Sequence, residues 1–337
     1  MMVTVDENNQ KLTDPYGRTV DYLRVSVTDR CDFRCQYCMS ENMTFLPKKD
    51  LLSFEELAEI CDMFVKLGTK KIRISGGEPL VRKNILNLLK QMGSWVEQGR
   101  LEELTLTTNG TQLKRFAQDL VSCNIKRINV SLDSLDPQKF QQITRWGKLE
   151  PVLDGIMAAK NLGIHVKINT VVMKDFNDQE LPNLIAWAHG HGFDISLIET
   201  MPMGEVEPDR VDQYQPLSEI RERLSSSWTL VPSNHRTAGP ATYVDVLQTG
   251  GRLGFITPLS HNFCESCNRV RLTCTGLLYL CLGQDDCYDL RKTLRKQEDL
   301  EKAIRHALGM KPKGHDFVID RTKGISGVHR HMSVTGG

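Results

Sequence analysis

The sequence contains no long apolar run. None of its hydrophobic stretches approaches the roughly 18 residues that a membrane-spanning helix needs, so we expect no spanning segment. The N-terminal segment carries Asp6, Glu7 and Asp14 and has no apolar core, unlike a signal peptide or a transit peptide. We therefore expect a cytoplasmic protein without a membrane partner.

A strong net charge is also missing. Lysine and arginine number 43 and aspartate and glutamate 42, which leaves a formal net charge of +1. This balance argues against a general attraction to nucleic acid, and an anionic ligand would need a local basic cluster. The chain has no Gly-x4-Gly-Lys-Ser/Thr loop either, so ordinary P-loop phosphate binding is not supported.

What is present is a globular composition in 337 residues, in which short β-branched runs alternate with helical stretches. We expect strands at Tyr22–Thr28, Lys71–Ser75, Glu103–Thr107, Arg127–Ser131, His165–Val172 and Ile195–Glu199. We expect helices from Ser53, where Glu56 completes a capping box, and at Lys83–Gly99, Gln112–Asn124, Pro151–Leu162 and Asp178–His189. About six such alternations predict a parallel sheet, either an open barrel or a doubly wound sheet, with chemistry at the carboxyl ends of its strands.

The alternation breaks down after about Leu230, where glycine and proline interrupt the pattern. One further helix is expected at Asp286–Ala307. We place a soft boundary near residue 235, which divides the chain into domains at 1–235 and 236–337.

Ten cysteines are unevenly distributed, and clustered cysteines in a reducing compartment favour metal or iron–sulfur ligation over disulfides. Cys31, Cys35 and Cys38 follow the first predicted strand directly. Three thiolates on a four-iron cluster leave one iron open to a small chelating molecule. A zinc site or three unrelated core cysteines are the alternatives, although no obvious fourth zinc ligand lies nearby.

The turn after the second predicted strand reads Ser75-Gly76-Gly77-Glu78-Pro79. Adjacent glycines let a ligand approach the backbone closely, and Glu78 offers a carboxylate. A tight turn between a strand and a helix would look the same.

Cys264 and Cys267 begin a second cysteine group. Its third ligand could be Cys281, Cys274 or Cys287, and spacing alone does not decide which of them it is. The alternative is a structural zinc site that stabilises a small C-terminal region. The adjacent Arg269 and Arg271 could bind a polyanion with forked donors, or they could lie on a solvated strand.

The two motifs together, Cys-x3-Cys-x2-Cys and Gly-Gly-Glu-Pro, resemble the radical S-adenosylmethionine (SAM) superfamily. This resemblance implies an α/β fold, a partial (β/α)6 TIM-like barrel of the radical SAM type with a C-terminal iron–sulfur region. It implies that Cys31, Cys35 and Cys38 bind a 4Fe-4S cluster, whose open iron binds SAM. An electron from the cluster would then cleave SAM to methionine and a 5′-deoxyadenosyl radical.

The whole chain from about Asp21 resembles one family, the GTP 3′,8-cyclases of molybdenum cofactor biosynthesis. The resemblance is carried by the second cysteine group, the closing Gly-Gly and the segments Leu23–Cys31, Lys71–Leu80, Thr107–Gly110, Asn129–Leu135 and Lys167–Val171. It implies a second 4Fe-4S cluster on Cys264, Cys267 and Cys281. Implied GTP contacts are Arg24, Arg73, Thr107, Lys167, Arg269, Val270 and Arg271, and implied SAM contacts are Tyr37, Gly77, Ser131 and Met201.

The resemblance implies conversion of GTP to (8S)-3′,8-cyclo-7,8-dihydroguanosine 5′-triphosphate. Arg269 and Arg271 would be catalytic together with Gly336 and Gly337, whose tail would reach into the active site. A buried cation on a core strand is costly without an anion, and Arg24, Arg73 and Lys167 fit a triphosphate unless internal carboxylates pair with them. GTP and an electron donor are the expected partners, and a homodimer is allowed. A peptide-modifying radical SAM enzyme and a non-catalytic iron–sulfur electron carrier are the rival functions.

Overall fold

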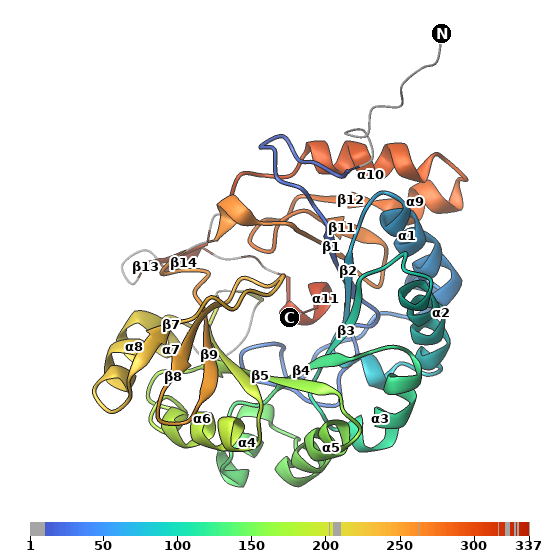
Figure 1. Cartoon of the computed structure of the whole chain (residues 1–337). Coiled ribbons are helices and arrows are strands. Elements are labelled where there is room, and N and C mark those ends of the chain that lie inside the picture. The colour runs from blue at the N-terminus through green and yellow to red at the C-terminus, as the bar shows by residue number, and fades with distance from the viewer. Residues whose placement is uncertain are drawn as a thin grey trace.

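One curled sheet of twelve strands forms the centre of the molecule (Figure 1). The computed structural model describes residues 11–201, 203–204, 210–261, 263–315, 317–320, 324–326, 328 and 330–336. The strands lie in the order β12-β11-β10-β1-β2-β3-β4-β5-β6-β9-β8-β7. Because β12 and β7 are both edge strands, the described part of the sheet is an open barrel and not a closed one.

Six parallel strands follow one another along the chain, as predicted. They are β1 (Tyr22–Ser26), β2 (Lys71–Ser75), β3 (Glu103–Thr108), β4 (Arg127–Ser131), β5 (His165–Val172) and β6 (Asp194–Glu199). Their outward side chains, such as Leu23, Val25 and Ile72, are fully buried and share one apolar cluster with helix residues such as Leu57 and Phe64. Burial of each such side chain contributes about 1.5–3 kcal/mol to folding.

Helices cover the outside of the barrel (Figure 1). They are α1 (Phe54–Lys66), α2 (Ile85–Glu97), α3 (Leu113–Ser122), α4 (Pro137–Thr144), α5 (Leu149–Asn161), α6 (Leu181–Gly190), α7 (Arg210–Gln213) and α8 (Leu217–Ser225). The predicted capping box is present, because Ser53 Oγ accepts from Glu56 N and Glu56 accepts from Ser53 N. Helix α4 was missed, although Pro137 at its first position and Asp136, which accepts from Gln138 N and Lys139 N, mark its start.

The C-terminal part of the chain extends the same sheet at both edges. Strands β7 (Leu230–Pro232), β8 (Thr242–Val246) and β9 (Gly251–Ile256) join it beside β6, where β9 is parallel to β6. Strands β10 (Arg269–Leu272), β11 (Leu277–Tyr279) and β12 (Cys287–Asp289) join it beside β1, where β10 is parallel to β1. The domain boundary near residue 235 stays a prediction, and strands from both sides of it share this sheet.

The single helix predicted at Asp286–Ala307 is wrong. The segment begins in β12 and continues as two helices, α9 (Leu290–Arg295) and α10 (Leu300–Gly309). Gln297, at φ 54°, interrupts the helical path, and Asp299 caps the second helix by accepting from Lys302 N. Strands β13 (Val318–Asp320) and β14 (Gly324–Ser326) form a separate pair.

The C-terminal helix α11 (Met332–Thr335) lies inside the ring of strands (Figure 1). Ser333 and Thr335 are almost fully buried there. At the other end of the chain, Arg18 donates to the carbonyl oxygens of Cys264, Pro312 and Lys313, at 2.6–2.7 Å. None of the helices within the described residues is long and apolar enough to cross a membrane.

Candidate functional site

The first cysteine loop follows β1 at the carboxyl edge of the parallel strands. Cys31, Cys35 and Cys38 form no disulfides and are partly exposed. Burial, followed by the proximity of Cys38 and Cys31, raises the pKa of the Cys35 thiol well above its ordinary value. The three sulfurs are thus close enough to influence one another, and their donor chemistry fits an iron–sulfur cluster.

Neighbouring strand ends hold this loop in place. Asp32 accepts from Asn109 Nδ2 and Thr111 Oγ1, both at 2.6 Å. Asn109 Nδ2 also lies 3.8 Å from Cys31 Sγ. On the other side, Arg34 donates to the Cys31 carbonyl at 2.8 Å. The side chains that fix the loop were not singled out from the sequence, because the partners of Asp32 are more than seventy residues away along the chain.

The glycine turn after β2 packs directly against the start of the cysteine loop. A Cβ at Gly77 would overlap the Arg30 carbonyl oxygen, so only glycine fits. Glu78 is fully buried and accepts from Leu80 N, Asn109 N and Thr108 Oγ1. Burial raises the pKa of Glu78 to about 8. The carboxylate expected to face a ligand is therefore already engaged by donors of the protein.

Three further residues predicted to contact SAM lie at the same edge of the barrel. Ser131 ends β4, Met201 comes shortly after β6, and Tyr37 belongs to the cysteine loop. Tyr37 donates to Asp133 Oδ2 at 2.7 Å, and Asp133 Oδ1 accepts from Val171 N at 2.8 Å. Burial raises the pKa of Asp133 to about 6. Asp133 thus ties the cysteine loop to the ends of β4 and β5, a role not predicted from the sequence.

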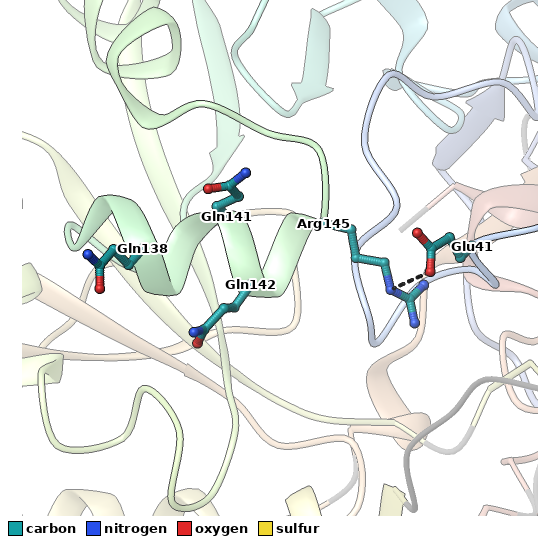
Figure 2. Close-up of a pocket in the computed structure, with 5 residues that line it drawn as sticks. All are labelled: Glu41, Gln138, Gln141, Gln142 and Arg145. Atoms are coloured by element: carbon teal, nitrogen blue, oxygen red, sulfur yellow. Dashed lines mark ion pairs between the residues drawn. The ribbon is translucent and has the colours of Figure 1, made fainter.

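A surface cavity of about 500 Å³ lies on the outer side of this loop (Figure 2). It is lined by Gln138, Gln141 and Gln142 of α4 and by Arg145 and Glu41, whose charged groups are 3.9 Å apart. No residue of the predicted site lines it. This cavity is therefore separate from the candidate site.

Arginines on three neighbouring strands form a row that faces the interior. Arg24 of β1 is in register with Arg73 of β2 on one side and with Arg271 of β10 on the other. Side chains in register on adjacent strands point to the same face. Burial, followed by Arg271 and Arg73, lowers the pKa of Arg24 well below its ordinary value. Burial and Arg269 lower the pKa of Arg271 to about 10.

Repulsion among these guanidinium groups favours an anion close to Arg73 and Arg271. Among the described residues, no carboxylate lies within ion-pair distance of Arg73 or Arg271, and Arg73 Nε is buried without a hydrogen-bond partner. Thr107 Oγ1, from the predicted GTP set, is likewise buried and unpartnered. Unpartnered buried polar atoms of this kind indicate space for a polar ligand. The pairing with internal carboxylates considered as an alternative is therefore not seen for Arg73 among the described residues.

Lys167 of β5 lies on the wall of a second cavity, of about 500 Å³, near the amino ends of the strands. Its ammonium donates to Tyr243 OH at 2.6 Å and sits 5.0 Å from the centre of the tyrosine ring. Burial, followed by Arg73 and Arg127, lowers the pKa of Lys167 to about 7. Near pH 7 about half of such lysines are protonated, and an arriving anion favours the charged form.

The second cysteine group lies at the opposite edge of the barrel. Cys264 and Cys267 precede β10, which is parallel to β1, and Cys281 follows β11, which is antiparallel to β10. All three therefore lie at the amino edge. Cys274 follows β10 at the carboxyl edge, where burial, followed by Asp29, raises its thiol pKa to about 12. Cys287 is exposed on the edge strand β12.

Cations surround this second group. Burial opposes ionisation of Cys267, but Arg269 and Lys311 outweigh it and lower the thiol pKa to about 7. A hydrogen bond with His315 is the main cause that lowers the pKa of Cys264. Three sulfurs in a cationic setting fit a metal–sulfur group, because thiolates are its ligands. Lys311 and Tyr243 were not predicted, because their roles depend on distant contacts.

The C-terminal tail reaches the arginine row. Arg271 Nη1 donates to the Gly336 carbonyl at 2.8 Å. Gly336 has a φ of 70°, and a Cβ there would overlap Ser75 Oγ, so the position requires glycine. Gly337 lies outside the described residues.

Comparisons with known proteins agree with this architecture. The Radical SAM superfamily model matches residues 25–188, and the Molybdenum Cofactor Synthesis C model matches residues 193–317. Streptococcus suis SuiB has a similar fold, with a TM-score of 0.60 and 17% identity over 86% of this chain and 67% of that one. Its structure bound to S-adenosylmethionine gives a TM-score of 0.57 at 18% identity over 86% and 69%. The predicted radical SAM partial barrel is confirmed.

Curated relatives are much closer in sequence. A GTP 3′,8-cyclase of Sinorhizobium medicae is 63% identical over 337 residues, which are 99% of this chain and 97% of that protein. A GTP 3′,8-cyclase of Rhizobium meliloti is 62% identical over 99% and 96%. Full-length similarity at this level confirms the resemblance seen in the motifs, and the chain belongs to the GTP 3′,8-cyclase family.

Proposed function

We propose that this enzyme converts GTP to (8S)-3′,8-cyclo-7,8-dihydroguanosine 5′-triphosphate, an early step of molybdenum cofactor biosynthesis. The observation that carries the proposal is the row of Arg24, Arg73 and Arg271, which faces the interior between the two cysteine groups. A polyanion supplies negative charge for Arg73 and Arg271, which form no ion pair among the described residues.

Radical SAM chemistry requires an iron–sulfur cluster and SAM. In our proposal Cys31, Cys35 and Cys38 hold the cluster, and Tyr37, Gly77, Ser131 and Met201 line the SAM site. When bound, this pair of cofactors supplies the radical that removes hydrogen from ribose C3′. Asp32 and Asp133 hold the cysteine loop against the strand ends, which orients both cofactors.

A second 4Fe-4S cluster on Cys264, Cys267 and Cys281 is the finer part of the proposal. Its support is the shared amino edge of the three cysteines and the position of Cys274 at the other edge. In this arrangement the substrate lies in the barrel between two metal–sulfur centres.

The GTP contacts that we propose are Arg24, Arg73, Thr107, Lys167, Arg269, Val270 and Arg271. Cations on β1, β2, β5 and β10 converge on the interior and can share the triphosphate charge. Forked guanidinium donors hold phosphate oxygens in a fixed orientation. Fixing both the phosphates and the base brings C3′ and C8 of one nucleotide together.

We also propose a catalytic role for two arginines of β10 and two glycines of the tail. Arg269 and Arg271 act with Gly336 and Gly337, because the Gly336 carbonyl fixes the Arg271 guanidinium at the substrate. The reaction also needs an external electron donor, and a homodimeric assembly stays a prediction.

Anaerobic analysis of iron and sulfide, combined with a GTP-dependent product assay, tests the function. We expect about eight irons per chain and a cyclised nucleotide. A peptide-modifying enzyme with the same fold would have the same iron content, but calorimetry would show no binding of GTP. An electron carrier would not cleave SAM when reduced.

A further inference from the structure

Lys311, which follows α10, is a buried cation that none of the proposed roles uses. Its side chain is only 2% exposed, and its ammonium donates to the Leu280 carbonyl at 2.6 Å and to Cys267 Sγ at 3.7 Å. No carboxylate of the described residues forms an ion pair with it. Since a buried ammonium is unfavourable without a nearby anion, its counter-charge must come from another group.

The groups around this ammonium are the cysteines of the second group. Cys267 is in direct contact, and Cys281 directly follows Leu280, whose carbonyl accepts the other hydrogen bond. Cys264 belongs to the same turn, because its carbonyl accepts from Cys267 N at 3.1 Å. The available counter-charge is therefore a set of thiolates.

The position of Lys311 relative to the cysteines is fixed by the fold. Arg18 donates to the carbonyls of Pro312 and Lys313 and to the carbonyl of Cys264. A buried ion pair with Asp14 holds Arg18 itself at 2.5 Å. One guanidinium thus fastens the segment that carries Lys311 to the loop that carries the cysteines.

We propose that Lys311 is the built-in counter-charge of the second iron–sulfur cluster and favours its reduced state. This inference rests on the second cluster of the proposed function. A cluster gains one negative charge when it is reduced, and a cation hydrogen-bonded to a ligand sulfur stabilises that charge more than it stabilises the oxidised form. Lys311 therefore raises the reduction potential of this cluster.

The test is a redox titration of the full chain, reconstituted with iron and sulfide and followed by electron paramagnetic resonance. Replacing Cys31, Cys35 and Cys38 together with alanine leaves the second cluster alone in the spectrum. In this background we expect Lys311→Met to lower the ratio of reduced to oxidised cluster about tenfold at a fixed potential. That change equals a shift of about 59 mV to more negative potential for one electron.

Lys313→Met is the matched control. It removes an exposed lysine two residues further on, and only the backbone of Lys313 takes part in the contacts described. We expect its potential and its iron content to equal those of the parent. An equal shift in both variants would overturn the proposal, because the effect would then be one of general charge.

The outcomes separate this inference from the function on which it rests. A parent protein without iron on the second group contradicts the second cluster itself. A parent with about four irons and a Lys311→Met variant of unchanged potential contradicts only the role of Lys311. If Lys311→Met holds no iron, Lys311→Arg decides: retention of iron supports a required charge, and loss of iron shows that the site needs the shape of lysine instead.

Discussion

The two edges of the barrel carry similar cysteine groups in opposite electrostatic surroundings. At the carboxyl edge, burial, followed by the carboxylates of Glu78 and Asp32, raises the pKa of Cys31. At the amino edge, Arg269 and Lys311 lower the pKa of Cys267 despite its burial. The contrast is local to the two cysteine groups, and the net charge of +1 does not reveal it.

This difference matches the two small molecules of the proposed reaction. SAM carries a positive sulfonium and is suited to the edge rich in carboxylates, whereas GTP carries a triphosphate and is suited to the cationic interior. We infer that one barrel can bind a cation and a polyanion together when the protein groups that bind them lie at opposite ends. The following predictions test each end in turn.

Loss of the first cluster should have the largest effect. We expect Cys35→Ser to abolish formation of 5′-deoxyadenosine, because the cluster loses one of three thiolate ligands. The measurement is anaerobic SAM cleavage by reduced protein. Cys287→Ser, at an exposed cysteine, is the control and should cleave SAM normally. Cleavage by Cys35→Ser at the rate of the unchanged protein would contradict the ligand assignment.

The second prediction concerns the amino edge alone. Cys281→Ala should lose the second cluster and about half of the iron, whereas Cys274→Ala should keep both. The reason is that Cys281 shares its edge with Cys264 and Cys267 and Cys274 does not. Iron content per chain measures the effect. Should Cys274→Ala be the variant with half the iron, the assignment by strand direction is wrong.

The choice between these cysteines shows how far the sequence could predict the site. The spacing of the cysteines did not decide whether Cys274 or Cys281 is the third ligand, because spacing carries no information on strand direction. The resemblance favoured Cys281, and the antiparallel pairing of β11 with β10 now supplies a physical reason. Parallel strands and their motifs were predictable, because hydrophobic runs and turn residues are local signals.

Features that depend on distant contacts were not predictable. Lys311 and Tyr243 acquire their importance from residues 44 and 76 positions away. The break at Gln297 was missed because hydrophobic spacing continues across it, and only the positive φ and the Asp299 cap reveal two helices. The strands that extend the sheet beyond β6 and β1 were not predicted, because short strands with glycines have weak periodic signals.

The third prediction tests the tail that lies between the two ends. Deleting Gly336 and Gly337 should lower the yield of cyclised product more than tenfold, a loss of about 1.4 kcal/mol or more of transition-state stabilisation. The reason is that Arg271 loses the carbonyl that fixes its guanidinium. Both clusters should remain, GTP should still bind, and SAM should still be cleaved without coupling.

Counting deoxyadenosine and cyclised nucleotide separately measures this uncoupling. Gly190→Ala is the control, because a Cβ at that position meets no atom within 4 Å. Unchanged cyclisation in the truncated chain would mean that the buried tail has no part in the reaction.

The smallest effect that we predict is a pH dependence of GTP binding through Lys167. In the free enzyme its pKa is lowered to about 7 by burial and then by Arg73 and Arg127, while Asp194 acts in the opposite direction. Bound phosphate favours the ammonium form and raises that pKa. Affinity is therefore greatest below pH 7, where Lys167 already carries its proton, and falls as pH rises above 7, where binding must take up a proton.

For one proton the dissociation constant can rise at most tenfold per pH unit, and we expect a rise of about threefold to tenfold between pH 7 and 8.5. Calorimetry in buffers of different ionisation enthalpy measures both the affinity and the proton uptake. Titration above pH 7 keeps the phosphate groups largely ionised, since the second pKa of a phosphate monoester is about 6. Lys167→Arg should flatten the profile, because a guanidinium keeps its charge over this range. An equally steep profile in Lys167→Arg would assign the proton to another group of the cavity, such as His235, and would leave Lys167 as a permanently charged contact.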